Sequence, residues 1–258
     1  MSSFIICLKA EVRKSRNSMA VWLSLAGTVA NLLLFLGLHL VGEQVGGGFS
    51  ANSWREYITN HYDGIAFMML PLYVIILCSL VFLMEHRSEM WVQLYTLAIS
   101  PRQVYLGKLA FLFLLFLGAH LLFILGMLFS GLLFGLLRPA SGLLDGLPDL
   151  GQIAELSART VLSILGLMGL HAWLSFRFKA FIVPLLIGIL GYVVAGLLGT
   201  GWYWQFLNPY APGFLFMPRY KGEAIIPHLG WFSGAELMSI AYLGLFTALA
   251  FITLKRRK

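Results

Sequence analysis

Residues 105–137 read YLGKLAFLFLLFLGAHLLFILGMLFSGLLFGLL, and this stretch decides the class of the fold. It is apolar throughout except for Lys108 near its start and His120 further along. Because an α-helix rises about 1.5 Å per residue, a helix of this length exceeds a hydrocarbon core of about 30 Å. We therefore predict a membrane-spanning helix that tilts or projects beyond the bilayer.

The rest of the chain is also too apolar for a soluble domain. Of its 258 residues, 59% are hydrophobic and 11% are charged, whereas soluble domains carry about 25% charged residues. Five further stretches have the length and composition of a span: Met19 to Val41, Ile65 to Met84, Leu156 to Phe176, Ala180 to Leu198 and Leu237 to Leu254. We predict an all-α fold, a single transmembrane domain over residues 1–258 with six spanning helices.

The basic residues predict the orientation of these spans. When the loops alternate between the two sides of the membrane, 13 of the 18 lysine and arginine residues fall on the side that holds both termini. Lysine and arginine are enriched in cytoplasmic loops, so both termini are expected in the cytoplasm. The net charge of +7 then reflects membrane orientation, and we exclude nucleic acid as a partner.

The two largest loops on the opposite side differ in character. Residues 42–63 form a polar loop with the flexible sequence Gly46-Gly47-Gly48. Residues 199–236 form a loop that is dense in aromatic residues and broken by prolines. Such a composition predicts short helices that lie at the outer interface or dip into it.

The N-terminal segment, residues 1–18, has the pattern of an amphipathic interfacial helix. Within SFIICLKAEVRKSR (residues 3–16), apolar residues recur at helical spacing. The cations that would contact inner-leaflet lipid headgroups are Lys9, Arg13, Lys14 and Arg16. A plain orientation signal without a separate role is the alternative.

A second cytoplasmic segment, residues 85–104, lies between the second and third spans. It begins EHRSEMWVQLYTLAIS at Glu85, breaks at Ser100-Pro101 and re-enters the membrane through Tyr105-Leu106-Gly107-Lys108. The residue before a proline disfavours helix, so the chain changes direction here, and Lys108 is expected to reach the inner surface by snorkelling. The segment forms an elbow that offers charged side chains to a partner.

The elbow resembles the same segment of type-two ABC exporter permeases, in which a Glu closes span two and a Ser/Pro-Arg turn precedes an aromatic-x-Gly-Lys re-entry. Three other passages agree with this resemblance. They are the pattern E-x-x-K-x-x-x-S at Glu11, Lys14 and Ser18, the passage HAWLSFRFKAFIVPLLIGILGYVVAG from His171, and Asn208-Pro209. The passage from His171 is similar to the lantibiotic-immunity and bacitracin-type branch.

The resemblance implies a permease subunit that dimerises in the bacterial cytoplasmic membrane and exports an amphipathic or hydrophobic substrate, such as a peptide antibiotic or a lipid-like molecule. ATP and Mg would bind a separate ABC ATPase, since this chain lacks the G-x-x-x-x-G-K-[ST] phosphate loop and is not expected to be an enzyme. The second permease is either identical or homologous. The elbow residues implied to couple to the ATPase are Glu85, Arg87, Glu89, Arg102 and Lys108.

Polar residues inside the spans are candidates for a substrate path or a subunit interface. These are His120 and Asn31, for which a neutral helix-packing role and hydrogen bonding between helices are the alternatives. His171 lies nearer the end of its span and is interpreted as an interfacial anchor. Small residues at Gly131, Gly135, Gly191, Ala195 and Gly199 predict close helix approach.

Two other classes of membrane protein compete with a permease. A b-type cytochrome needs paired histidines at matching depth, but His120 and His171 differ in depth by more than about 10 Å at 1.5 Å per residue. No H-E-x-x-H or G-x-S-G motif indicates an intramembrane protease, and no cofactor or metal is expected in this chain. The alternative to a permease is a non-transporting accessory membrane subunit or a membrane-embedded enzyme.

Overall fold

The computed structural model describes residues 3–45, 54–64, 69–87, 100–198, 203–211 and 228–256, and these are almost entirely helical. The helices are α1 (Ser3–Ser15), α2 (Met19–Val45), α3 (Trp54–Gly64), α4 (Leu70–Arg87), α6 (Pro101–Leu137), α7 (Leu150–Arg177), α8 (Ile182–Leu198) and α10 (Gly234–Arg256). Short 3-10 helices are η2 (Pro139–Ser141), η3 (Leu143–Asp145) and η4 (Tyr203–Leu207). Strands β1 (His228–Leu229) and β2 (Phe232–Ser233) form an antiparallel hairpin.

Four of the described helices are long and apolar enough to cross a membrane: α2, α6, α7 and α10. The shorter apolar helices α4 and α8 occupy the places of the second and fifth predicted spans. Helix α6 runs from Pro101 to Leu137, which makes it about 55 Å long. The prediction of a helix longer than the hydrocarbon core is therefore confirmed.

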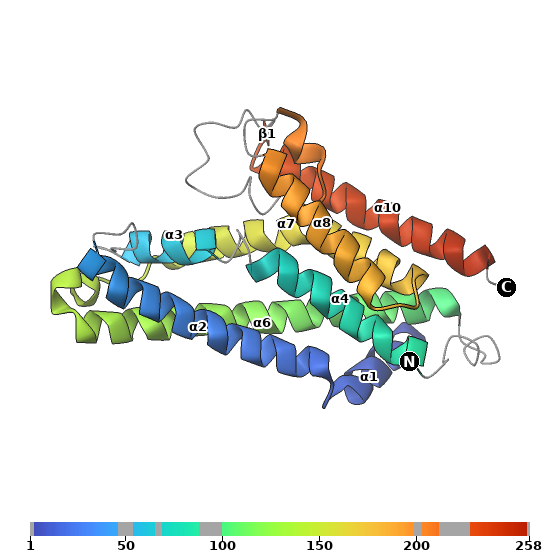
Figure 1. Ribbon diagram of the computed structural model, residues 1–258, viewed down its shortest axis with the longest axis horizontal. Coiled ribbons are helices and arrows are strands. Elements are labelled where there is room, and N and C mark those ends of the chain that lie inside the picture. Colours follow the sequence, from blue (N-terminus) through green and yellow to red (C-terminus); the bar gives the residue numbers. More distant parts are fainter. Residues whose placement is uncertain are drawn as a thin grey trace.

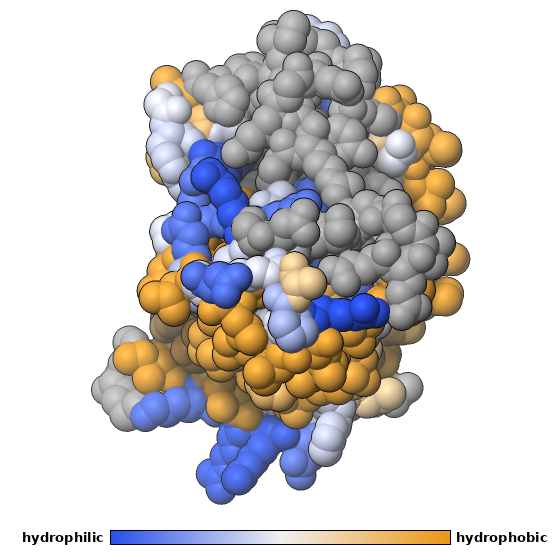
Figure 2. All heavy atoms as spheres, turned by 90° about the vertical axis from the view of Figure 1, so that its left-hand side faces the viewer, coloured by the Kyte–Doolittle hydropathy of each residue, from blue (hydrophilic) through white to orange (hydrophobic). Residues whose placement is uncertain are grey.

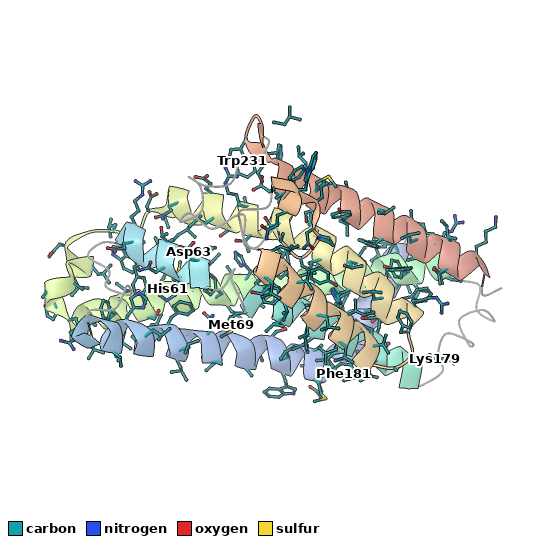
Figure 3. All side chains as sticks on the ribbon, turned by 45° about the horizontal axis from the view of Figure 1, so that its top comes forward. His61, Asp63, Met69, Lys179, Phe181 and Trp231 are labelled. Atoms are coloured by element: carbon teal, nitrogen blue, oxygen red, sulfur yellow. The ribbon has the colours of Figure 1, made fainter. Side chains whose placement is uncertain are left out.

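The helices form an elongated bundle with both chain ends at one end of it, which we call the terminal end (Figure 1). The turn between α7 and α8, with Lys179 and Phe181, also lies there (Figure 3). Many large apolar side chains are exposed on the flanks, among them Trp22, Leu190 and Leu197. Figure 2 shows apolar surface on the bundle with hydrophilic side chains gathered beside and below it. Such a surface suits lipid as the surrounding solvent.

Helix α3 lies within the segment that we predicted to be a polar loop. Its Trp54 and Tyr57 rings pack against Gly131 of α6, and the Tyr62 ring packs against His120 and Phe123 of the same helix. The contacts move from residue 131 back to residue 120, so α3 descends about 16 Å alongside α6. Figure 3 shows His61 and Asp63 on this helix and Met69 beyond them, where α4 begins.

Hydrogen bonds fix α3 at each turn. The Tyr57 and Tyr62 hydroxyls bond those of Ser130 and Ser157 at 2.8 and 2.7 Å, and Trp54 Nε1 donates to the Gly146 carbonyl at 3.1 Å. The sequence did contain a signal for this helix. Large side chains recur at positions 54, 57, 58, 61 and 62, which is the period of one helical face.

A close approach between the long helices α7 and α10 involves two glycines that we did not select from the sequence. A Cβ added at Gly166 of α7 would lie 2.9 Å from the Cα atom and the carbonyl oxygen of Ser239 in α10. The Ser239 hydroxyl accepts a hydrogen bond from the Gly166 amide at 2.7 Å and donates one to the Ser163 carbonyl at 2.9 Å. Gly169 meets Leu243 in the same way. Helices α7 and α10 therefore form one tightly packed pair.

The glycines that we did select accommodate side chains rather than another helix backbone. Gly135 faces Leu143 and Leu144 of η3, and Gly191 of α8 faces the ring of Tyr210. The small-residue pattern predicted close approach of helix backbones, but Gly131 meets ring atoms from α3, and Gly135 and Gly191 meet side chains from connecting segments. Gly199 lies outside the described residues.

Gly166→Ala should destabilise the chain because Ser239 meets the new Cβ with backbone atoms, which cannot rotate away. Overpacking of this kind costs about 1–3 kcal/mol, so the melting temperature of the variant in detergent should be lower than that of the unmodified chain. Fluorescence-detected size exclusion after heating measures this temperature. Gly244→Ala on α10 is the matched control, since nothing lies within 4 Å of its Cβ position. Equal melting temperatures for the two variants would contradict the packing described here.

Candidate functional site

The described part of the predicted elbow is its return into the bundle. Ser100 is extended (φ −64°, ψ 126°), and Pro101 occupies the first turn of α6, where a proline needs no amide partner. Arg102 is exposed and its guanidinium lies 5.6 Å from the centre of the Phe251 ring. Glu89 and the side chains of Glu85 and Arg87 lie outside the described residues.

Lys108 does not snorkel to the surface as predicted. Its side chain is fully buried, and Nζ lies 2.8 Å from a carboxylate oxygen of Glu11, with the Phe82 ring 5.4 Å away. The prediction failed because α1 covers this part of α6 and offers a buried carboxylate, so the ammonium group is neutralised within the protein. The pair joins two of the sequence passages on which the family resemblance rested.

Aromatic packing surrounds this ion pair on the bundle side. The ring of Tyr105 is buried and contacts Phe82 of α4, Phe176 of α7 and Phe251 of α10. On the opposite side, a Cβ at Gly107 would lie 2.9 Å from the Cβ of Cys7 in α1. The start of α6 is therefore held by four other helices within one turn of Lys108.

Helix α1 presents one face to α6 and another to its surroundings. Cys7, Glu11 and Ser15 are buried, one helical turn apart. Burial raises the pKa of the Cys7 thiol, and the charge of Glu11 adds to this effect. The exposed face carries the apolar Ile5 and Val12 beside the predicted lipid-contacting cations Lys9, Arg13, Lys14 and Arg16.

A second feature is a partly open cavity of about 90 Å³ that is lined by α2, α4 and α6. Asn31 and His120, which the sequence analysis selected, both line it. Ser24 and Tyr73 line it as well, and their hydroxyls are hydrogen-bonded at 2.8 Å. The structure thus brings together two residues that lie far apart in the sequence.

His120 also lines a wider and more open groove between α6, α7 and the β1–β2 hairpin, with a volume of about 600 Å³. The other groove residues are almost all apolar, including Leu121, Val161 and Trp231. The hairpin is held over the groove by Arg159, which pairs with Glu236 at 3.0 Å and lies 4.7 Å from the Trp231 ring centre. One histidine therefore forms a shared wall of the cavity and the groove.

His171 is not an interfacial anchor as predicted. It is fully buried, and its Nε2 lies 3.1 Å from the hydroxyl of Tyr210, which follows η4. The prediction failed because the segment after η4 packs onto α8, where Gly191 makes room for the Tyr210 ring.

Among the described residues, no group of three His, Cys, Asp or Glu side chains is placed to hold a metal ion.

Lys108→Met should destabilise the chain because the buried Glu11 carboxylate keeps only the partly exposed Lys14, 3.8 Å away, as a counter-charge. Removal of one partner of a buried pair costs about 3–5 kcal/mol. The double variant Glu11→Gln/Lys108→Met should recover most of the lost melting temperature, whereas Lys9→Met, at an exposed cation of α1, should have no effect. A double variant no more stable than Lys108→Met alone would refute this account.

Comparison with known protein families identifies the class of this chain. A family model described as ABC-2 family transporter protein matches residues 7–196, which reach from α1 into α8. No curated protein matches the chain. The family normally supplies the membrane-embedded transport subunit and implies association with ABC ATPase subunits. The chain therefore belongs to the ABC-2 transporter family and is a multi-pass membrane permease subunit of an ABC transporter.

Proposed function

We propose that this permease subunit exports an amphipathic or hydrophobic substrate, powered by a separate ABC ATPase that docks on the elbow. The observation that carries the proposal is the buried Glu11–Lys108 pair at the base of the elbow. Force applied to residues 85–104 would pass into α6, and through the ion pair into α1. An ATPase bound at this end could then move two helices together.

The proposed topology has six spans with both termini in the cytoplasm of a bacterium. Helices α4 and α8 would complete the set formed by α2, α6, α7 and α10. Both chain ends (Figure 1) and the Lys179 turn (Figure 3) lie at the terminal end, which supports this orientation because cytoplasmic ends carry the excess of basic residues. In the same frame, the exposed cations of α1 would contact anionic headgroups of the inner leaflet.

The proposed coupling surface comprises Glu85, Arg87, Glu89 and Arg102. Arg102 is exposed at the start of α6, where a charged partner residue can reach it. Lys108 belongs to the same elbow in sequence, but its burial gives it a positioning role within the permease. ATP and Mg would be bound by the partner ATPase.

The proposed assembly contains a second permease, identical or homologous, that lies beside this chain in the membrane. The large exposed apolar faces of α2 and α8 leave room for both lipid and a second subunit. A peptide antibiotic or lipid-like substrate, as in the lantibiotic-immunity and bacitracin-type branch, would suit the apolar groove beside α6 and α7.

The assembly can be tested by purifying the tagged chain from its native host in a gentle detergent and identifying co-purifying proteins by mass spectrometry. An ABC ATPase in stoichiometric amount is the expected result, together with either one or two permease sequences. A preparation without any ATPase would contradict the proposal and favour a non-transporting accessory subunit.

Replacement of Glu85 or Arg102 by Ala should reduce transport by the reconstituted complex while membrane insertion stays normal, because neither residue lies within a predicted span and Arg102 is exposed. The ratio of substrate moved to ATP hydrolysed should fall for both variants. Lys179→Ala is the matched control, an exposed cation at the other turn of the same end. Unchanged transport in both elbow variants would remove the elbow from the mechanism.

A further inference from the structure

The cavity between α2, α4 and α6 contains polar groups but no fixed charge. Its described lining includes no Lys, Arg, Asp or Glu, and its polar side chains are Ser24, Thr28, Asn31, Tyr73 and His120. A charged ligand group placed here would leave water without meeting a counter-charge, which is strongly unfavourable within a bilayer. The lining therefore selects for uncharged groups.

The hydroxyl groups of the cavity are already engaged. Ser24 donates to the Ala20 carbonyl at 2.9 Å and shares a hydrogen bond with Tyr73, and Thr28 donates to the Ser24 carbonyl at 2.8 Å. Two side chains retain hydrogen-bonding capacity. Asn31 Nδ2 and both ring nitrogens of His120 have no hydrogen-bond partner among the described residues.

Both of these side chains are more than nine-tenths buried, since Asn31 is 5% exposed and His120 is 6% exposed. Buried polar groups are costly unless they are hydrogen-bonded, and hydrocarbon supplies no partner. The Asn31 amide nitrogen needs an acceptor, and a neutral imidazole offers one donor and one acceptor. A hydroxyl or a primary amide meets these needs together because it both donates and accepts.

The groove supplies the apolar complement to this polar site. The groove has a volume of about 600 Å³, whereas the cavity has about 90 Å³. His120 lines both spaces. A cavity of this size holds a head of a few non-hydrogen atoms, whereas the groove, lined by Leu117, Leu121 and Ile124, suits an alkyl chain. The two spaces share only His120 as a wall, so an amphiphile whose small head reaches past this ring into the cavity would leave its tail in the groove.

We propose that Asn31 and His120 form the head-group site for an uncharged amphiphile, a long-chain alcohol or primary amide, whose alkyl tail lies in the groove between α6 and α7. This inference rests on the proposed function and names the chemical class of its substrate. Asn31 Nδ2 donates to the oxygen of the head, and the head exchanges a second hydrogen bond with the His120 ring.

The test uses the full chain in phosphatidylcholine nanodiscs, without an ATPase. The probe is a C16 alcohol that carries a diazirine in its tail and an alkyne tag. Peptide mapping should find saturable labelling on α6 and α7 around the groove. Unlabelled hexadecan-1-ol should compete with the probe and reduce the labelling. Hexadecyltrimethylammonium and hexadecyl sulfate should compete about tenfold less well, because their heads lose at least one hydrogen bond in the site.

The variants separate the head-group site from the groove. Asn31→Leu and His120→Phe should each weaken competition by hexadecan-1-ol about tenfold, and His120→Gln should retain it because Gln both donates and accepts. Leu122→Phe, on an exposed face of α6, is the matched control. Equal competition by all three head groups, non-saturable labelling, or unchanged competition in both Asn31→Leu and His120→Phe would overturn the proposal.

A failure of the head-group site can be distinguished from a failure of the proposed function. Loss of saturable labelling while an ABC ATPase still co-purifies would reject the head-group site and leave the permease assignment in place. Saturable labelling without an associated ATPase would leave the site standing and reject the coupled exporter.

Discussion

The buried ion pair between Glu11 and Lys108 is the interaction on which the terminal end of the bundle depends. It places a charged residue of α1 against the start of α6, directly after the turn at Pro101. A buried pair contributes little net stability compared with apolar packing, but either charge alone is strongly unfavourable. Such a pair therefore specifies where α1 lies more than it stabilises the fold. The aromatic cluster around Tyr105 then transmits that position to α4, α7 and α10.

Deeper in the bundle, buried polar groups also need partners within the protein, because hydrocarbon offers them none. Helix α3 carries tyrosine and tryptophan hydrogen-bonding groups into the space beside α6, and each finds a partner on a neighbouring segment. Asn31 and His120 differ because their remaining capacity is directed to a cavity. This contrast separates polar groups that hold the fold together from those available to a ligand.

Much of the fold could be predicted because apolar stretches report directly on helices in lipid. The start of α2 and the end of α6 follow from the charged residues beside them, and the start of α6 follows from Pro101. The failures share one cause. Lys108 and His171 were assigned to the membrane surface from their distance to the end of a span, but segments distant in sequence cover both residues. Helix α3 was missed because its polar residues outweighed the helical spacing of its large side chains.

From its sequence alone, this protein is predicted to be helical and apolar enough to lie in a membrane, and its motifs resemble those of type-two ABC exporter permeases. The first two conclusions need only composition and hydropathy, which any segment carries within itself. The tertiary structure was needed to show that Glu11 neutralises Lys108, that α7 and α10 meet at Gly166, and that Asn31 shares a cavity with His120. Each of these is a contact between distant segments. The packing of whole helices sets such contacts, and no local pattern specifies that packing.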